Sequence, residues 1–400
     1  MFSDIQIKRD IYGSDEHKML IESFWNFLEA EAKPYHDQWE KDRMVDRAAW
    51  LKAGELGFLC LDVPEEYGGA GLDYTFNAVI TELGSKSGYT GLGFSLHSDI
   101  VVPYFIHYGT EAQKKKFLPK MASGEWISCI GMTEPNTGSD LQAIKTNAVD
   151  KGDYYLVNGS KTFITNGYLS DFSIVACKTN VGTEREGISL IIIENSEGYS
   201  KGKPFEKLGL KANDTCELFF EDVKVPKENL LGEEGKGFIY MMKELPRERL
   251  SVAINAIGGS EGAIEETVKY TQERRAFKRP IAGFQNTQFK LADQAAQLQV
   301  HQVYVDKCIE LLCENKLTAE QASIAKLTCT EMHSKLVDEC LQLFGGYGFM
   351  WEYPIAKNYA DSRVARIYAG TNEIMKILIS RGLFREYFQE MKKMRAKKNA

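Results

Sequence analysis

The feature that most constrains the fold is a change of texture along the chain: a block of strand-like segments, residues 127–232, lies between two helix-like regions. Runs rich in β-branched and aromatic residues predict strands, because such side chains suit a pleated, half-buried surface. They occur at Phe172–Lys178, Gly187–Glu194 and Cys216–Val225. No long helical pattern separates them, so we expect an antiparallel barrel or sandwich and not a βαβ sheet.

A hairpin is also expected within this block. The strand-like segments 154–157 and 161–165 flank the dipeptide Asn158-Gly159. Asn-Gly is a favoured pair for two-residue hairpin turns, because both positions need positive φ. The sequence therefore predicts strand, tight turn and strand between Tyr154 and Thr165.

The regions on either side of the block are expected to be helical. Apolar side chains near helical spacing predict a helix over residues 16–33. Beyond the block, segments rich in helix formers predict long helices at Glu248–Ala276, Gln285–Asn315, Thr318–Phe344 and Thr371–Met391. Long helices with short connections favour an antiparallel bundle. We therefore predict an α+β multidomain protein with an N-terminal α-helical domain (1–126), a middle antiparallel β-barrel domain (127–232) and a C-terminal four-helix-bundle domain (233–400).

Composition argues against several classes of protein. The 400 residues include 49 basic and 56 acidic side chains, a net charge of −7, whereas a general nucleic-acid binder usually has a basic excess. Eight cysteines without a Cys-x-x-Cys pair favour free thiols, and six histidines without zinc spacing predict no metal site. The longest apolar runs are far shorter than the roughly 20 residues of a membrane span. The N-terminus shows no targeting signal, so a cytoplasmic location is expected.

Several common motifs are missing or misplaced. The 34 glycines include no Gly-x-Gly-x-x-Gly and no Walker A loop, which disfavours a Rossmann-type dinucleotide site. Residues 258–262 match Gly-x-Ser-x-Gly, but a nucleophile elbow needs a strand before it, and the preceding residues look helical. We interpret the small residues here as a place where another helix, or a slender ligand, approaches closely.

Five further segments are ambiguous when each is taken alone. The stretch 129–140 runs from an apolar strand into a polar loop, and 163–167 places an aromatic beside a hydroxyl; each suits either a ligand site or ordinary packing. Arg274 ends a predicted helix, where the helix dipole alone favours a cation. Gly345-Gly346 and Gly370-Thr371 lie at helix boundaries, where turns and capping explain much of the pattern.

Together, and in this order, these segments resemble the acyl-CoA dehydrogenase family. The resemblance covers nearly the whole chain and includes the helical, β, helical arrangement. It rests on Met132-Thr133-Glu134-Pro135 with Gly138-Ser139-Asp140, Gly159-Ser160-Lys161 through Thr165-Asn166-Gly167, Glu273-Arg274 through Phe277, Gln342 with Gly345-Gly346, and Gly370-Thr371.

The resemblance implies a flavoenzyme with FAD between the β domain and the C-terminal helices. Arg274, Phe277 and Gln285 would reach the FAD of a neighbouring subunit, which implies an oligomer, most simply a homotetramer. The family often has tryptophan where Phe163 stands, so ring stacking is retained without an indole N–H. The residues implied in cofactor binding are Met132, Thr133, Gly138, Ser139, Phe163, Thr165, Arg274, Phe277, Gln285, Gln342, Gly345, Gly346, Thr371 and Glu373.

The catalytic base needs a separate argument. Much of the family has a glutamate directly before the Gly-Thr that corresponds to Gly370-Thr371, but this chain has Ala369, which cannot accept a proton. The long-chain and isovaleryl branches instead place the glutamate on a long helix just before an arginine, as in Glu248-Arg249. The glutamate that is missing at position 369 and the glutamate that is present at position 248 fit the same branch pattern, so Glu248 is the expected base. The residues implied in substrate binding are Ser139, Arg249, Ala369 and Gly370.

The implied reaction is α,β-dehydrogenation of an acyl-CoA thioester to a trans-2-enoyl-CoA, as in fatty-acid β-oxidation. Glu248 would take the α-proton, the Ala369 N–H would stabilise the enolate oxygen, and flavin N5 would take the β-hydride. An electron-transfer flavoprotein would reoxidise the flavin. The sequence resembles the long-chain branch most, which suggests a medium or long acyl chain. A branched or short-chain enzyme of the isovaleryl type, an acyl-CoA oxidase and a non-enzymatic relative remain alternatives.

Overall fold

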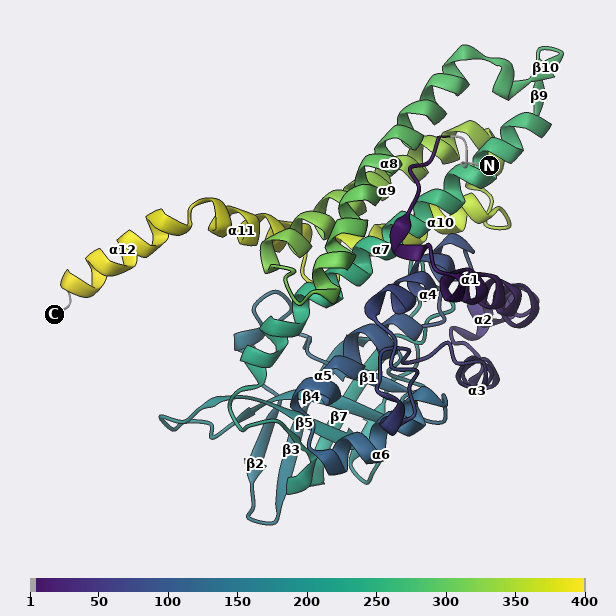
Figure 1. The fold of residues 1–400 in the computed structure, drawn as a ribbon. Coiled ribbons are helices and arrows are strands. Elements are labelled where there is room, and N and C mark those ends of the chain that lie inside the picture. Colours follow the sequence, from purple (N-terminus) through teal and green to yellow (C-terminus); the bar gives the residue numbers. More distant parts are fainter. Residues whose placement is uncertain (1–4, 399–400) are drawn as a thin grey trace.

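The computed structural model describes residues 5–398 and shows helical regions at both ends of a β region (Figure 1). The predicted helix over 16–33 begins one residue earlier, and its last turn is a π-helix at Leu28–Ala32. The Ser14 side chain caps it by accepting a hydrogen bond from the His17 N–H. The helices before the sheet are α1 (Asp15–Phe27), α2 (His36–Asp42), α3 (Arg47–Glu55), α4 (Tyr74–Lys86), α5 (Val102–Tyr108) and α6 (Glu111–Ala122).

The middle region forms one mixed sheet. Its strands are β1 (Ser128–Gly131), β2 (Asn147–Asp150), β3 (Tyr154–Ile164), β4 (Phe172–Thr179), β5 (Gly187–Glu194), β6 (Tyr199–Lys201), β7 (Cys216–Pro226) and β8 (Leu230–Leu231). The strand order is β6-β7-β3-β2-β4-β5-β8, with β1 beside β4. The three segments predicted as strands at Phe172–Lys178, Gly187–Glu194 and Cys216–Val225 are confirmed as β4, β5 and β7.

The predicted antiparallel β-barrel is not confirmed. β6 and β8 lie at opposite ends of the strand order and do not pair, so the sheet is open within the described residues. Two of its pairings are parallel: β1 with β4, and β2 with β4. Parallel neighbours need a long connection, and the 40 residues between β1 and β4 supply one that includes β2 and β3.

The predicted Asn158-Gly159 hairpin turn is wrong. β3 runs straight through this dipeptide, and its pairing with β7 shifts register between Val157 and Gly159, as at a β-bulge. Gly159 has φ 142°, and a Cβ there would lie 2.6 Å from the Thr146 Cα. The glycine is therefore needed for close approach of a neighbouring backbone and not for a chain reversal.

The helices after the sheet depart from prediction mainly at their ends. α7 begins eleven residues before Glu248 and passes through Pro246, where sequence patterns normally end a helix. The predicted last helix is divided at Phe384 into two. The elements are α7 (Gly237–Glu273), the hairpin β9 (Arg275–Ala276) and β10 (Arg279–Pro280), α8 (Gln285–Cys313), α9 (Ala319–Phe344), α10 (Pro354–Ser362), α11 (Asn372–Leu383) and α12 (Arg385–Lys398).

A shared helical core fixes the position of α7. α7, α8 and α9 lie side by side, and α11 packs on α9 (Figure 1). Tyr74 and Ala78 of α4 belong to the same buried cluster as the core residues of α7. A Cβ at Gly258 would lie 2.1 Å from the Glu82 carbonyl oxygen, which confirms that the small residues admit a neighbouring helix. No helix in the described part of the chain is both long and apolar enough to cross a membrane.

Candidate active site

Glu248 lies about three turns into α7 and is buried, with 5% of its surface exposed. Its Oε1 accepts a hydrogen bond of 3.0 Å from the hydroxyl of Tyr104 on α5. Burial raises the pKa of Glu248 to about 7, although the Tyr104 hydrogen bond and the Arg249 charge oppose the shift. A carboxylate with this pKa can take and hold a proton near neutral pH, as a general base must.

A second buried carboxylate, Glu244, lies one turn before Glu248. It accepts hydrogen bonds from the Tyr108 hydroxyl at 2.7 Å and lies 2.9 Å from the His107 Nδ1. Two glutamates four residues apart on α7 thus face two tyrosines four residues apart on α5. Sequence reasoning missed both tyrosines, because nothing local shows which helix packs against α7.

Arg249 brings a cation to the same region. It is buried, and its Nε has no hydrogen-bond partner among the described residues. Burial lowers the pKa of the guanidinium, whereas the Glu248 charge raises it. Buried donors in folded proteins normally have an acceptor. The Arg249 Nε–H lacks one within the described residues, so it is free to donate to an acceptor on a ligand.

The Ala369-Gly370 turn is anchored beside α9. The Lys326 Nζ donates to the Gly370 carbonyl at 2.9 Å and to the Asn372 Oδ1 at 2.8 Å. Burial and the charge of Arg249 lower the pKa of Lys326 to about 8. The two hydrogen bonds of Lys326 tie the turn and the start of α11 to α9.

The turn itself is held in a strained conformation. Ala369 has φ 51° and Gly370 has φ 85°, both left-handed. For alanine this conformation costs roughly 1–2 kcal/mol. The Ala369 N–H donates to no acceptor within residues 5–398. Thr371 caps α11 as predicted, with its hydroxyl accepting from the Ile374 N–H, and Glu373 follows in the first turn.

The predicted cofactor residues of the β region lie on two segments that are tied together. The Lys161 Nζ donates to the Met132 carbonyl at 3.2 Å, and the Thr162 N–H donates to the Thr133 carbonyl at 2.9 Å. These bonds hold the loop that carries Gly138 and Ser139 against the end of β3. At that end Phe163 has positive φ and is 68% exposed, with Thr165 two residues beyond.

A buried ion pair beneath this loop escaped sequence reasoning. The Lys161 Nζ lies 2.8 Å from the Glu134 Oε1, and neither side chain reaches solvent appreciably. Glu134 also accepts from the Lys145 and Thr146 N–H groups. Burial alone would raise the pKa of Glu134, but Lys161 and these bonds lower it. The pair fixes the start of the loop relative to β3.

The other predicted cofactor residues gather at the far end of α7. The Arg274 guanidinium lies 5.5 Å from the Tyr347 ring, in the Gly345–Phe349 turn that follows Gln342 on α9. Phe277, in the β9–β10 hairpin, is 89% exposed, and Gln285 begins α8.

One chain does not bring this far group to the β-region residues. The 26 residues from Glu248 to Arg274 span about 39 Å of helix. Figure 1 shows β9 and β10 at the end of the molecule away from the sheet. The two groups of predicted cofactor residues therefore lie apart within one chain.

One group of potential metal ligands occurs in the described residues, at His36, Asp37 and Glu40. The Lys357 Nζ lies 2.8 Å from an Asp37 oxygen and 2.9 Å from a Glu40 oxygen. The ammonium group therefore takes the place that a cation would occupy between these carboxylates.

Comparison with known proteins decides the family. Three family models match in order: the acyl-CoA dehydrogenase N-terminal domain over residues 14–125, the middle domain over 129–223 and the C-terminal domain over 235–384. The chain belongs to the acyl-CoA dehydrogenase family.

Individual members of the family are similar over most of their length. The mitochondrial long-chain specific acyl-CoA dehydrogenase of Rattus norvegicus is 48% identical over 95% of this chain and 88% of its own. The crystal structure of an acyl-CoA dehydrogenase from Geobacillus kaustophilus is also 48% identical, with TM-score 0.90 over 92% of this chain and 98% of that one. A Bacillus anthracis acyl-CoA dehydrogenase complexed with FAD is 35% identical, with TM-score 0.89 over 96% of this chain and 69% of that one.

Proposed function

We propose that this family member is an FAD-dependent enzyme that converts an acyl-CoA thioester to the trans-2-enoyl-CoA, with Glu248 as the base. The observation that carries the proposal is a buried glutamate with a pKa of about 7 in a chain whose residue 369 cannot accept a proton. Position 369, where much of the family has its glutamate, is an alanine, whereas position 248 has a glutamate. Glu248 is therefore the one candidate to accept the α-proton.

Glu248 removes the α-proton while the surrounding groups stabilise the developing enolate. The unpaired Ala369 N–H is the donor for the thioester oxygen, and its strained turn holds it in place before substrate arrives. Such a preorganised donor contributes on the order of 3 kcal/mol to transition-state stabilisation. When bound, FAD supplies the acceptor for the β-hydride.

The residues that would hold FAD fit such a group. Exposed Phe163 offers a flat apolar face, and Thr133, Ser139 and Thr165 carry hydroxyls on the same two connected segments. At the far end of α7, a Cβ on Gly345 or Gly346 would meet nothing within 4 Å, so this turn leaves room for a ligand. We propose that Arg274, Phe277, Gln285, Gln342, Gly345 and Gly346 complete the site of a neighbouring subunit in a homotetramer.

We further propose a medium or long acyl chain, a role in β-oxidation and electron transfer to an electron-transfer flavoprotein. The similarity to the rat long-chain enzyme supports the chain length. None of the eight cysteines forms a disulfide, which supports a reducing compartment such as the cytoplasm.

The test is anaerobic bleaching of the FAD-loaded protein by a panel of straight and branched acyl-CoA thioesters. We expect bleaching by medium and long straight chains, and we expect Glu248→Gln to keep its FAD but bleach far more slowly. Failure to bind FAD would contradict the cofactor assignment. Unchanged bleaching in Glu248→Gln would place the base elsewhere.

A further inference from the structure

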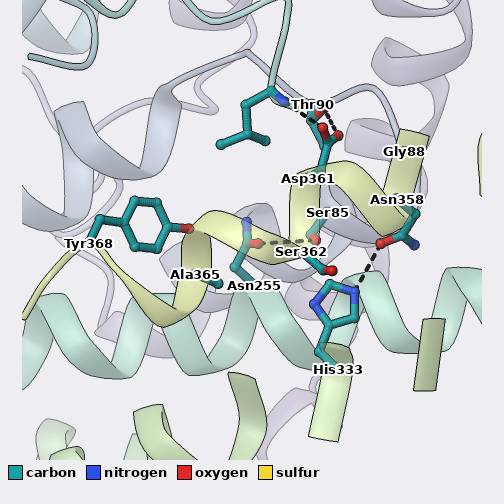
Figure 2. Close-up of a pocket in the computed structure, with 11 residues that line it drawn as sticks. Ser85, Gly88, Thr90, Asn255, His333, Asn358, Asp361, Ser362, Ala365 and Tyr368 are labelled. Carbon is teal, nitrogen blue, oxygen red and sulfur yellow. Dashed lines mark hydrogen bonds between the residues drawn. The ribbon is translucent and has the colours of Figure 1, made fainter. Parts of the chain in front are cut away.

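A small polar cavity lies beyond the site already described, between the segment after α4 and helices α7, α9 and α10 (Figure 2). Its volume is about 20 Å³, which is room for about one water molecule or one hydroxyl group. Polar side chains that line it include Ser85, Thr90, Asn255, His333 and Asp361. An acyl-chain pocket made only for methylene groups would not need these residues.

His333 brings an unused acceptor to this cavity. The Asn358 Nδ2 donates to the Gly259 carbonyl at 2.8 Å, so the Asn358 Oδ1 is the atom that accepts from the His333 Nε2 at 2.9 Å. Burial lowers the pKa of His333 to about 4, and the ring is neutral at pH 7. With its proton on Nε2, the buried Nδ1 presents a lone pair, and it has no partner in the described chain.

Asn255 brings a donor to the same cavity. Its Oδ1 accepts from the Ser85 hydroxyl at 3.3 Å, which leaves the Nδ2 group without an acceptor among the described residues. The cavity thus holds one free acceptor and one free donor. A hydroxyl group satisfies both, because it donates one hydrogen bond and accepts another, whereas a ketone can only accept.

The cavity lies at a definite distance from the base. Asn255 is seven residues after Glu248, so both project from the same face of α7, about 10 Å apart along its axis. Tyr368 also lines the cavity, and it directly precedes Ala369 (Figure 2). A chain bound with its α-carbon at Glu248 and its thioester oxygen at Ala369 can therefore extend towards this cavity.

Glycine at position 259 is required for this arrangement. A Cβ there would lie 2.8 Å from the His333 Cε1 and 3.0 Å from the Ser85 Oγ. Any side chain would push the imidazole away from α7 and close the space. A glycine inside a helix costs about 1 kcal/mol relative to alanine. The close contact with His333 and Ser85 explains why Gly259 is nevertheless a glycine.

The charge around the cavity excludes an anionic group. None of the residues found to line it is a lysine or an arginine. Asp361 is buried beside it, where its carboxylate accepts from the Thr90 hydroxyl at 2.6 Å and from the Leu210 N–H. A carboxylate at the end of an acyl chain would meet this aspartate with no cationic side chain in the cavity lining.

We propose that the cavity binds a neutral hydroxyl on the distal part of the acyl chain, so that the substrates include hydroxyacyl-CoA thioesters. The proposal rests on the function proposed above. An extended chain advances about 1.2 Å per bond, since three backbone bonds span about 3.6 Å. The distance of about 10 Å between Glu248 and Asn255 along α7 therefore corresponds to about eight or nine bonds beyond the α-carbon. The hydroxyl is therefore expected near the tenth carbon of the acyl chain.

The test compares ω-hydroxyacyl-CoA thioesters with their unsubstituted partners at each chain length. Both kcat/KM and the calorimetric Kd are measured on the FAD-loaded enzyme. We expect the hydroxylated thioester to be favoured about tenfold at one length, near ten carbons, and to be disfavoured at shorter lengths. The ω-oxo and ω-carboxy thioesters of that length should lack the advantage. A hydroxyl that is disfavoured at every length would overturn the proposal and would show that the cavity holds only a structural water.

Two variants assign the effect to the cavity. Asn255→Leu keeps the side-chain size and removes the donor, so the hydroxyl preference should disappear while unsubstituted thioesters still bleach the flavin. Ser334→Ala, on the same helix as His333 but outside the lining, should keep the preference. A preference that survives in Asn255→Leu would refute the assignment. If no acyl-CoA of either kind bleaches the wild-type flavin, the proposed function itself fails, which is a separate outcome.

Discussion

The part of α7 around Glu248 and the C-terminal end of α7 around Arg274 differ in how many of their polar groups are paired within one chain. Around Glu248 the polar groups are buried and mostly paired within the chain, as the Tyr104 hydrogen bond shows. Around Arg274 the side chains are exposed, and Phe277 is almost fully so. The same helix therefore carries a buried, internally paired site and a separate, exposed set of residues. Under the proposed function, the first set carries out the chemistry within one chain, and the second helps to hold the cofactor of a neighbouring subunit.

The largest expected effect is on the chemical step. Glu248→Gln removes the base but keeps the side-chain volume, and anaerobic bleaching by acyl-CoA should slow by about 10³-fold or more. Glu244→Gln is the matched control, because it changes an equally buried, tyrosine-bonded glutamate one turn away, and it should slow bleaching by less than about tenfold. Equal losses in the two variants would mean that burial in this region, and not proton abstraction, is what the assay reports.

The Glu134–Lys161 ion pair beneath the Met132–Ser139 loop should matter most for stability. Lys161→Met leaves Glu134 buried without its counter-charge, which is expected to lower the free energy of unfolding by about 3 kcal/mol. Chemical denaturation measures this loss, and FAD content should fall with it because the Met132–Ser139 loop loses its anchor. Lys178→Met removes an exposed pair with Glu186 and should change stability by less than about 1 kcal/mol. Similar losses in both variants would contradict the role given to burial.

A substitution at the C-terminal end of α7 should weaken FAD binding without changing proton abstraction by Glu248. Arg274→Ala is expected to weaken FAD retention about tenfold, measured by equilibrium dialysis, while the FAD-saturated enzyme bleaches at the wild-type rate. Arg275→Ala is the control, since this neighbour donates only to the Lys278 carbonyl in an exposed hairpin. Wild-type FAD retention in Arg274→Ala would break the comparison, because the second end of α7 would then have no part in the cofactor site.

The smallest effect is a shift of a pH profile. The Tyr104 hydrogen bond lowers the pKa of Glu248, so Tyr104→Phe should raise it. The loss of about 1 kcal/mol of interaction corresponds to about 0.7 pH unit. The inflection in bleaching rate against pH should move up by that amount, and a downward shift would contradict the assigned sign.

Local patterns predicted much of the fold and failed where distant segments decide the outcome. β4, β5 and β7 were recognisable because each is rich in β-branched and aromatic residues. The parallel β1–β4 pairing joins segments 40 residues apart, so no local pattern reports it. Asn158-Gly159 misled because Thr146, directly before β2, lies so close that it requires the glycine.

The candidate site likewise contains some residues that the sequence identifies and others that only the packing of distant segments reveals. The absence of a carboxylate at Ala369 and its presence at Glu248 are visible in the sequence, and a family resemblance gave them meaning. Tyr104, the Glu134–Lys161 pair and the unpaired Nδ1 of His333 could not be found this way. Each acquires its environment from a helix or strand that is remote in sequence.

The most direct test of the central claim is the rate of anaerobic flavin bleaching by saturating acyl-CoA, followed by stopped flow as a function of pH. A base must be deprotonated to act, so the wild-type rate should rise with pH through an inflection near 7, the pKa that burial gives to Glu248. Glu248→Gln should lose both the rate and the inflection. An inflection that persists in Glu248→Gln would show that another group takes the α-proton.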